Sequence, residues 1–314
     1  GNYTSTETRG GGGGGRVAAV YDTVAQAALP VPGISFAADG GRSGGAEKAF
    51  GDIGTLYFPD TRLLGETIAW PGQWVIPGLA EWSPASLTVS NTWTRFPADG
   101  FACTVAGDVV VTGPRGRLDL GGMHYDTHEG RGMAADDRPQ RLSAGGGLEL
   151  RDGASLYVYA AATSGIPGEA QTRIEVGGTL RVASNCWVYP RSHITRGSVC
   201  FFGADRLSVA AGGGFNADGL GFCRAGPDWY LNGRGPGRGN GNPNIGPGNG
   251  TGAGHGGKGG KSFSVYGLAY GCSNAPLYAG STGGNFGNDR SGNAGGAVCI
   301  RVTGKAELAG TLTA

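Results

Sequence analysis

The chain contains 314 residues, of which 66 are glycine, and its 25 Lys and Arg residues nearly balance its 24 Asp and Glu residues. Average proteins contain roughly 7% glycine, and the strict third-residue glycine of collagen is absent here. This composition excludes a collagen helix, disfavours α-helix because an interior glycine costs roughly 1 kcal/mol relative to alanine, and provides no basic surface for nucleic acid.

No stretch approaches the roughly 20 apolar residues that a membrane-spanning helix needs, so we expect no membrane insertion. The chain begins at Gly1 without a Met or a signal peptide. This start indicates either a processed mature form or an excised piece.

The first part of the chain is rich in glycine, most densely at Gly10–Gly15. Four tryptophans follow between residues 70 and 96, together with several prolines: Trp70, Trp74, Trp82 and Trp93. Two interpretations remain open for these aromatic residues, which either fill the wall of the fold or form a capping or lateral contact region.

Short alternating strands separated by glycines recur through the middle of the chain, as in one coil of a parallel β-helix after another. The clearest pairs are 148–150 with 156–158 and 174–176 with 180–182; others are 109–111 with 118–120, then 207–209, and 300–302 with Leu308 and Leu312. Equivalent positions lie 26 residues apart from Leu148 to Ile174 and 24 from Leu156 to Leu180. Side chains along a strand alternate between its two faces, so Leu, Ile and Val of these segments point inward and Glu, Arg, Asp and Ser point outward.

We therefore expect an all-β fold, a right-handed parallel β-helix (β-solenoid) with long glycine-rich surface excursions. It forms a single domain over 1–314, with the following parts: N-terminal glycine-rich coils (1–60), central coils (61–225), a glycine-rich excursion (226–296) and C-terminal strands (297–314). Stability in such a fold comes from stacking, so its two ends are the exposed parts.

One segment, HYDTHE, has the residue types of a metal site. If it is a strand, alternation places His124, Asp126 and His128 on one face within reach of a metal such as zinc. Glycines bracket the segment, and a loop would have no such alternation.

Nucleotide-binding and catalytic motifs are weak. Residues 256–262 (GGKGGKS) resemble a phosphate-binding loop, but His255 stands where its first glycine belongs and a strand-like segment follows. The adjacent Asp136 and Asp137 would face opposite sides of a strand, which makes them a poor acid–base pair. We expect no enzyme activity and no cofactor.

Six cysteines are spread singly without a Cys-x-x-Cys pair, which favours disulfides in an oxidising compartment over zinc. The candidates are Cys103, Cys186, Cys200, Cys223, Cys272 and Cys299, and their pairing cannot be derived from the sequence. Asn2 and Asn249 each begin an Asn-x-Thr acceptor for N-glycosylation. Aromatic residues in the glycine-rich excursion either anchor it or stack on sugars, so extracellular glycans are a second class of partner.

Five segments resemble the glycine-rich repeat proteins of large bacterial surface and secreted polypeptides, of the type found in Verrucomicrobia and Planctomycetes: 10–22 (GGGGGGRVAAVYD), 34–41 (ISFAADGG), 51–60 (GDIGTLYFPD), 212–221 (GGGFNADGLG) and 270–284 (YGCSNAPLYAGSTGG). The resemblance implies a parallel β-helix at the cell surface. In that family the segment resembling 304–314 runs on into a GGGGGGRV-like strand, which here lies at the other end of the chain.

One coil is thus split between the two ends of the chain, and the ends of two copies would complete it. Such a contact between different surfaces propagates as a fibre. We therefore expect a homopolymeric extracellular filament whose subunit interface consists of Arg16, Val17, Val20 and Tyr21 at one end and Leu308, Leu312 and Ala314 at the other.

Overall fold

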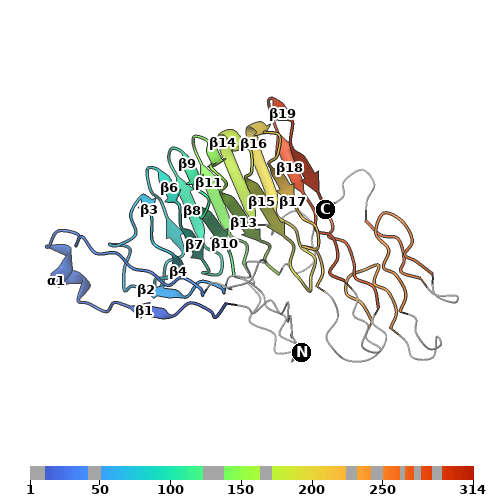
Figure 1. The fold of residues 1–314 in the computed structure, drawn as a ribbon, viewed down its shortest axis with the longest axis horizontal. Helices are drawn as coiled ribbons and strands as arrows, with labels where there is room; N and C mark the ends of the chain where they lie inside the picture. The colour runs from blue at the N-terminus through green and yellow to red at the C-terminus, as the bar shows by residue number, and fades with distance from the viewer. Residues whose placement is uncertain are drawn as a thin grey trace, which may run out of the picture.

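The computed structural model describes residues 11–41, 51–122, 138–162, 172–223, 232–241, 250–261, 266–271, 277–284 and 292–314. These residues are organised mainly by parallel strands (Figure 1). The helix among them, α1 (Thr23–Ala27), has five residues, and the Asp22 side chain caps it by accepting hydrogen bonds from the amides of Val24 and Ala25. The predicted all-β composition is confirmed.

The strands form two parallel sheets. The smaller has nine strands, in the pairing order β1 (Arg16–Ala18), β2 (Thr55–Tyr57), β4 (Gly72–Val75), β7 (Trp93–Phe96), β10 (Arg117–Leu120), β13 (Ser155–Tyr159), β15 (Trp187–Arg191), β17 (Gly214–Asn216) and β20 (Thr311–Thr313). Successive strands step along the molecule from β1 to the C-terminal end (Figure 1).

The larger sheet has 11 strands: β3 (Thr67–Ile68), β5 (Glu81–Trp82), β6 (Leu87–Ser90), β8 (Ala102–Val105), β9 (Val109–Thr112), β11 (Arg141–Ala144), β12 (Leu148–Arg151), β14 (Arg173–Val182), β16 (Phe201–Val209), β18 (Cys299–Val302) and β19 (Ala306–Leu308). Its long strands β14 and β16 pair with each other, and each also pairs with short strands along both halves of its length.

The predicted right-handed parallel β-helix (β-solenoid) is wrong, because the strands are arranged in these two large parallel sheets. The sequence predicted two strands with a glycine corner at residues 177–178. Instead, β14 runs through these glycines as one ten-residue strand, with only a register shift between Val176 and Thr179. A Cβ at Gly177 would lie 2.6 Å from the carbonyl oxygen of Gly145. The glycine therefore permits a close approach of two backbones instead of making a corner.

The predicted strand positions and their inward residues are confirmed. Leu148 is fully buried and pairs in register with Val109 on one side and Leu180 on the other, both also buried. Outward positions of the same strands carry charge, as in the ion pair between Arg181 and Glu149. Each fully buried aliphatic side chain contributes roughly 1.5–3 kcal/mol, so the stacked inner rows form the core.

Three of the four tryptophans fill the interior. Trp74 is buried, Trp70 stacks on it with ring centroids 5.8 Å apart, and Trp82 packs against the core. The fourth, Trp93, lies on the outer side of β7, beside charged side chains. Core filling therefore accounts for the aromatic cluster except for Trp93.

The described parts of 232–296 contain no strand and form what we call the glycine bundle: 232–241, 250–261, 266–271, 277–284 and 292–296. Their backbones bond to one another, with N–H groups of Gly239, Gly254 and Gly284 donating to carbonyls of other segments at 2.8–3.0 Å. In Figure 1 they lie beside the C-terminal end of the sheets. A Cβ at Gly239 would collide with the carbonyl oxygen of Thr251, so this packing needs glycine.

We therefore expect Gly239→Ala to loosen the glycine bundle, because the new methyl group would overpack it by roughly 1–3 kcal/mol. Gly260→Ala is the matched control, since a Cβ there meets no atom within 4 Å. Limited proteolysis of the native protein should cleave the Gly239 variant faster within 232–296 and leave the control unchanged. Equal cleavage of the two variants would contradict backbone-to-backbone packing.

Candidate functional site

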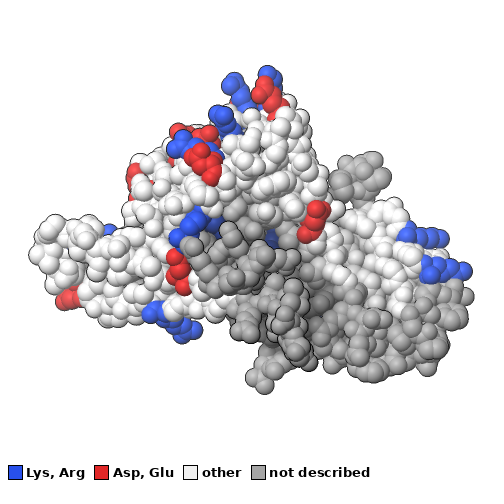
Figure 2. Space-filling model, viewed as in Figure 1, with Lys and Arg blue, Asp and Glu red and all other residues white. Residues whose placement is uncertain are grey.

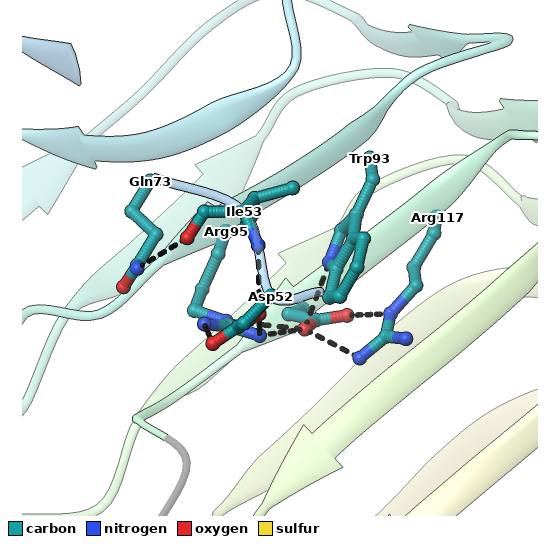
Figure 3. Close-up of polar contacts among 7 residues, drawn as sticks. Asp52, Ile53, Gln73, Trp93, Arg95 and Arg117 are labelled. Carbon is teal, nitrogen blue, oxygen red and sulfur yellow. Dashed lines mark hydrogen bonds and ion pairs between the residues drawn. The ribbon is translucent and has the colours of Figure 1, made fainter. Parts of the chain in front are cut away.

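A buried ion network lies on the outer side of the smaller sheet (Figure 3). Arg95 on β7 and Asp119 on β10 are register partners, only 1% and 0% exposed, and their side chains meet at 2.9 Å. The same guanidinium donates two hydrogen bonds of 2.9 Å to the carboxylate of Asp52. Asp119 also accepts hydrogen bonds from Trp93 Nε1 at 3.1 Å and from Arg117 Nε at 2.6 Å.

The guanidinium of Arg95 keeps its charge. Burial alone would lower the pKa of Arg95, but the hydrogen bonds to Asp52 and the charges of Asp119 and Asp52 outweigh it, so the pKa is raised. Because each carboxylate is paired with arginine, the network acts as a clamp. It fixes the segment around Asp52 onto the sheet and has no group set up to transfer a proton.

Planar side chains stack in a row beside this clamp. The guanidinium of Arg117 lies 3.8 Å from the ring centroid of Trp93 and 3.6 Å from that of Tyr157. Tyr157 in turn stacks on Tyr189 with centroids 4.4 Å apart. The neighbouring cavity of about 480 Å³ is lined by residues including Trp93, Arg117 and Arg115, and Arg115 is paired with Asp39 at 2.8 Å. The stacked faces cover one another, so this row stabilises the sheet rather than offering open rings to a ligand.

The strongest candidate for function is the C-terminal end of the sheets, which we call the terminal surface. It contains a concavity of about 800 Å³ between the last strands and the glycine bundle. Its lining includes the large aliphatic side chains of Leu207, Val298, Ile300, Val302, Leu308 and Leu312. Leu308 is 54% exposed and Leu312 is 46% exposed, although both occupy positions equivalent to core residues further along the sheets.

The exposure follows from strand pairing. Leu312 pairs with the fully buried Phe215, and partners in a parallel ladder face the same side of the sheet. In the part of the chain that the structure describes, β18 and β19 pair only with β16, and β20 pairs only with β17. The inner rows therefore end in leucines that no further strand covers.

The opposite end of the smaller sheet is also open. Strand β1 pairs only with β2 among the described strands, and Val17 faces inward beside the buried Leu56. Close by, Val20 is 81% exposed and Val24 is 82% exposed. Tyr21 is already engaged within the chain, because its hydroxyl donates a 2.6 Å hydrogen bond to Asp60.

The predicted interface residues thus lie at two separate ends of one molecule. Arg16, Val17, Val20 and Tyr21 belong to the β1 end, and Leu308, Leu312 and Ala314 belong to the terminal surface. Other predicted positions fall outside the described residues: His124, Asp126 and His128, the acceptors Asn2 and Asn249, and Cys272.

Cys103, Cys186 and Cys200 are thiols without a disulfide. Cys103, Cys186, Cys200 and Cys299 are buried, and Cys223 is half-buried. Burial raises the pKa of Cys103 to about 12. The thiol of Cys200 donates to the carbonyl oxygen of Val158 at 3.3 Å. These side chains therefore act as small apolar groups of the core.

Within the described residues, no group of three or more His, Cys, Asp and Glu side chains is arranged to hold a metal ion. No helix within those residues has the length and apolar character to cross a bilayer.

Comparison with protein-family models, with curated proteins and with solved structures gave no match. The function must therefore be inferred from the surfaces themselves. Sequence reasoning did not find the buried clamp, although Arg95 and Asp119 lie 24 residues apart, close to the strand repeat. That spacing and the opposite charges at two outward positions are the signal that predicts their contact.

Replacing Arg95 by leucine should destabilise the protein by about 3–5 kcal/mol, because it leaves two carboxylates without their buried counter-ion. The free energy of unfolding from urea denaturation tests this. Arg181→Leu, which removes an exposed partner of Glu149, serves as the control and should change stability by less than about 1 kcal/mol. Similar losses in the two variants would contradict the clamp.

At pH 8 Cys103 should resist alkylation by iodoacetamide in the native protein, because a thiol with a pKa near 12 has almost no thiolate at that pH and is buried. Peptide mass spectrometry with and without denaturant measures this directly. Rapid modification of native Cys103 would show that the thiol is accessible, and a disulfide at this position would show that it is not free.

Proposed function

We propose that this chain is a non-catalytic structural unit of an extracellular filament, in which copies join end to end. The observation that carries the proposal is the terminal surface, where Leu308 and Leu312 continue inner apolar rows but remain exposed. The extracellular location rests on the resemblance of the glycine-rich segments to bacterial surface proteins.

The strands at the two open ends can pair in parallel. The pairs among the described strands are all parallel, and β1 and β20 are the first and last strands of the same sheet. A second copy can therefore place its β1 beside β20 in the orientation that every earlier strand of this sheet has. Unpaired N–H and C=O groups at both edges would then gain partners.

Apolar burial supplies the driving force. Leu308 and Leu312 at one end, and Val20 and Val24 at the other, are large apolar side chains with about half or more of their surface exposed. Complete burial of one such side chain contributes roughly 1.5–3 kcal/mol. Because the two ends are different surfaces, each added copy leaves another open end, and the contact propagates as a fibre.

The double variant Leu308→Asp with Leu312→Asp should stay monomeric, since two carboxylates at the terminal surface cannot be buried. The wild-type chain should form filaments visible by electron microscopy and polymers detectable by light scattering. Leu268→Asp is the matched control, because Leu268 is 63% exposed yet does not line the terminal concavity, and it should still polymerise. A wild-type chain that stays monomeric at all concentrations would contradict the proposal.

A mixing experiment tests whether the contact joins unlike ends. Val20→Asp with Val24→Asp blocks the β1 end and leaves the terminal surface intact. Mixed with the Leu308/Leu312 double variant, it should form a one-to-one dimer that grows no further, while each variant alone stays monomeric. Dimers of either variant alone would instead indicate a contact between like ends.

A further inference from the structure

A second concavity, of about 730 Å³, crosses the outer side of the larger sheet, and we call it the sheet groove. Its lining comes from five neighbouring strands, β8, β11, β14, β16 and β18. Figure 2 shows positive and negative side chains interspersed along the upper part of the molecule, where β14, β16 and β19 lie in Figure 1. The groove has no role in the proposed end-to-end contact.

One row of outward residues runs along the groove. The register connects Thr104, Ser143, Glu175, Gly203 and Arg301 on successive strands. Adjacent strands lie about 4.8 Å apart, so the row spans about 19 Å. This length suits an extended chain-like ligand better than a compact one.

Gly203, beside Glu175 in the row, leaves room for the Glu175 side chain. A Cβ there would collide with Glu175 Oε2, so the carboxylate of Glu175 lies over the glycine. The other oxygen of this carboxylate meets Arg173 Nη1 at 3.4 Å, which holds the group in place. Glu175 is 45% exposed and therefore presents an oriented acceptor to the groove.

The end of the row carries a guanidinium. Arg301 is exposed on β18, and among the described residues it has no hydrogen-bond or ion-pair partner. A second carboxylate, that of Asp205, lines the same groove and accepts a hydrogen bond from Thr303 at 3.4 Å. Phe201 adds an aromatic ring, with Arg173 5.1 Å from its centroid.

This combination of groups identifies the ligand class. Sugar hydroxyls both donate and accept hydrogen bonds, and the groove offers acceptors at Glu175 and Asp205 and hydroxyls at Thr104 and Ser143. The free guanidinium of Arg301 matches a carboxylate in bidentate geometry. Glu175 and Asp205 would repel a polyanion with closely spaced charges such as nucleic acid, so the groove suits a largely neutral chain with a single acid beside Arg301.

We propose that the sheet groove binds an acidic oligosaccharide with one isolated uronate, whose carboxylate lies on Arg301 while hydroxyls of neighbouring neutral sugars contact Glu175 and Asp205. Binding at this site does not depend on polymerisation, because the row from Thr104 to Arg301 is complete within one chain.

Isothermal titration of the monomeric Leu308/Leu312 double variant with a xylo-oligosaccharide that carries one glucuronate tests the proposal apart from assembly. We expect binding that weakens with added salt, and an affinity at least about tenfold lower for Arg301→Gln, since a hydrogen bond to a charged group is lost. Gly203→Val should also abolish binding, because its side chain would occupy the place of the Glu175 carboxylate. Arg181→Gln removes an exposed arginine outside the groove and should bind as the parent does.

The neutral xylo-oligosaccharide of the same length should bind at least about tenfold more weakly than the one that carries glucuronate. Equal affinity for neutral and acidic sugars would overturn the role of Arg301. An unchanged affinity in both Arg301→Gln and Gly203→Val would overturn the groove as the site. No binding of any acidic oligosaccharide, by a protein whose circular dichroism spectrum is native, would overturn the proposal as a whole.

Discussion

Parallel pairing in register is the constraint on which the rest of this structure depends. Each inner strand gives its N–H and C=O groups to two neighbours, and each inward side chain packs on equivalent residues before and after it. At the last strand of such a stack, backbone N–H and C=O groups and inward side chains lack partners unless another element covers them. Leu308 and Leu312 show this directly, because they hold core positions without the next strand. The strand pairing that builds the core therefore also leaves an apolar surface exposed at the end of the stack.

Glycine serves this constraint in two ways. Inside β14, Gly177 lets the backbone approach Gly145 closely enough for the strand to continue without a corner. In the glycine bundle, segments without strands bond backbone to backbone, and Gly239 has no room for a side chain against Thr251. A high glycine content therefore produces dense packing here, although the same composition read from sequence alone is typical of loose surface loops.

Local patterns predicted much of the fold, and long-range geometry accounts for what they missed. Alternation at 148–150 and 180–182 predicted the strands and their buried faces, because the period of two is a property of each strand alone. The sheet arrangement was predicted wrongly, since a glycine pair is compatible with a corner or with close strand contact, and only the position of Gly145 decides between them. The Arg95–Asp52 contact joins residues 43 apart, a spacing with no repeat to predict it.

The two proposed surfaces meet at β18. This strand carries Ile300 and Val302 into the terminal surface and Arg301 onto the opposite side, into the sheet groove. Alternation within four residues therefore separates an apolar face suited to another copy from a charged face suited to a sugar acid. If copies join through β1 and β20, each copy brings its own sheet groove, and the filament carries a series of such grooves. A long acidic polysaccharide would then contact several copies at once and bind the filament more tightly than a single chain, without any new type of contact.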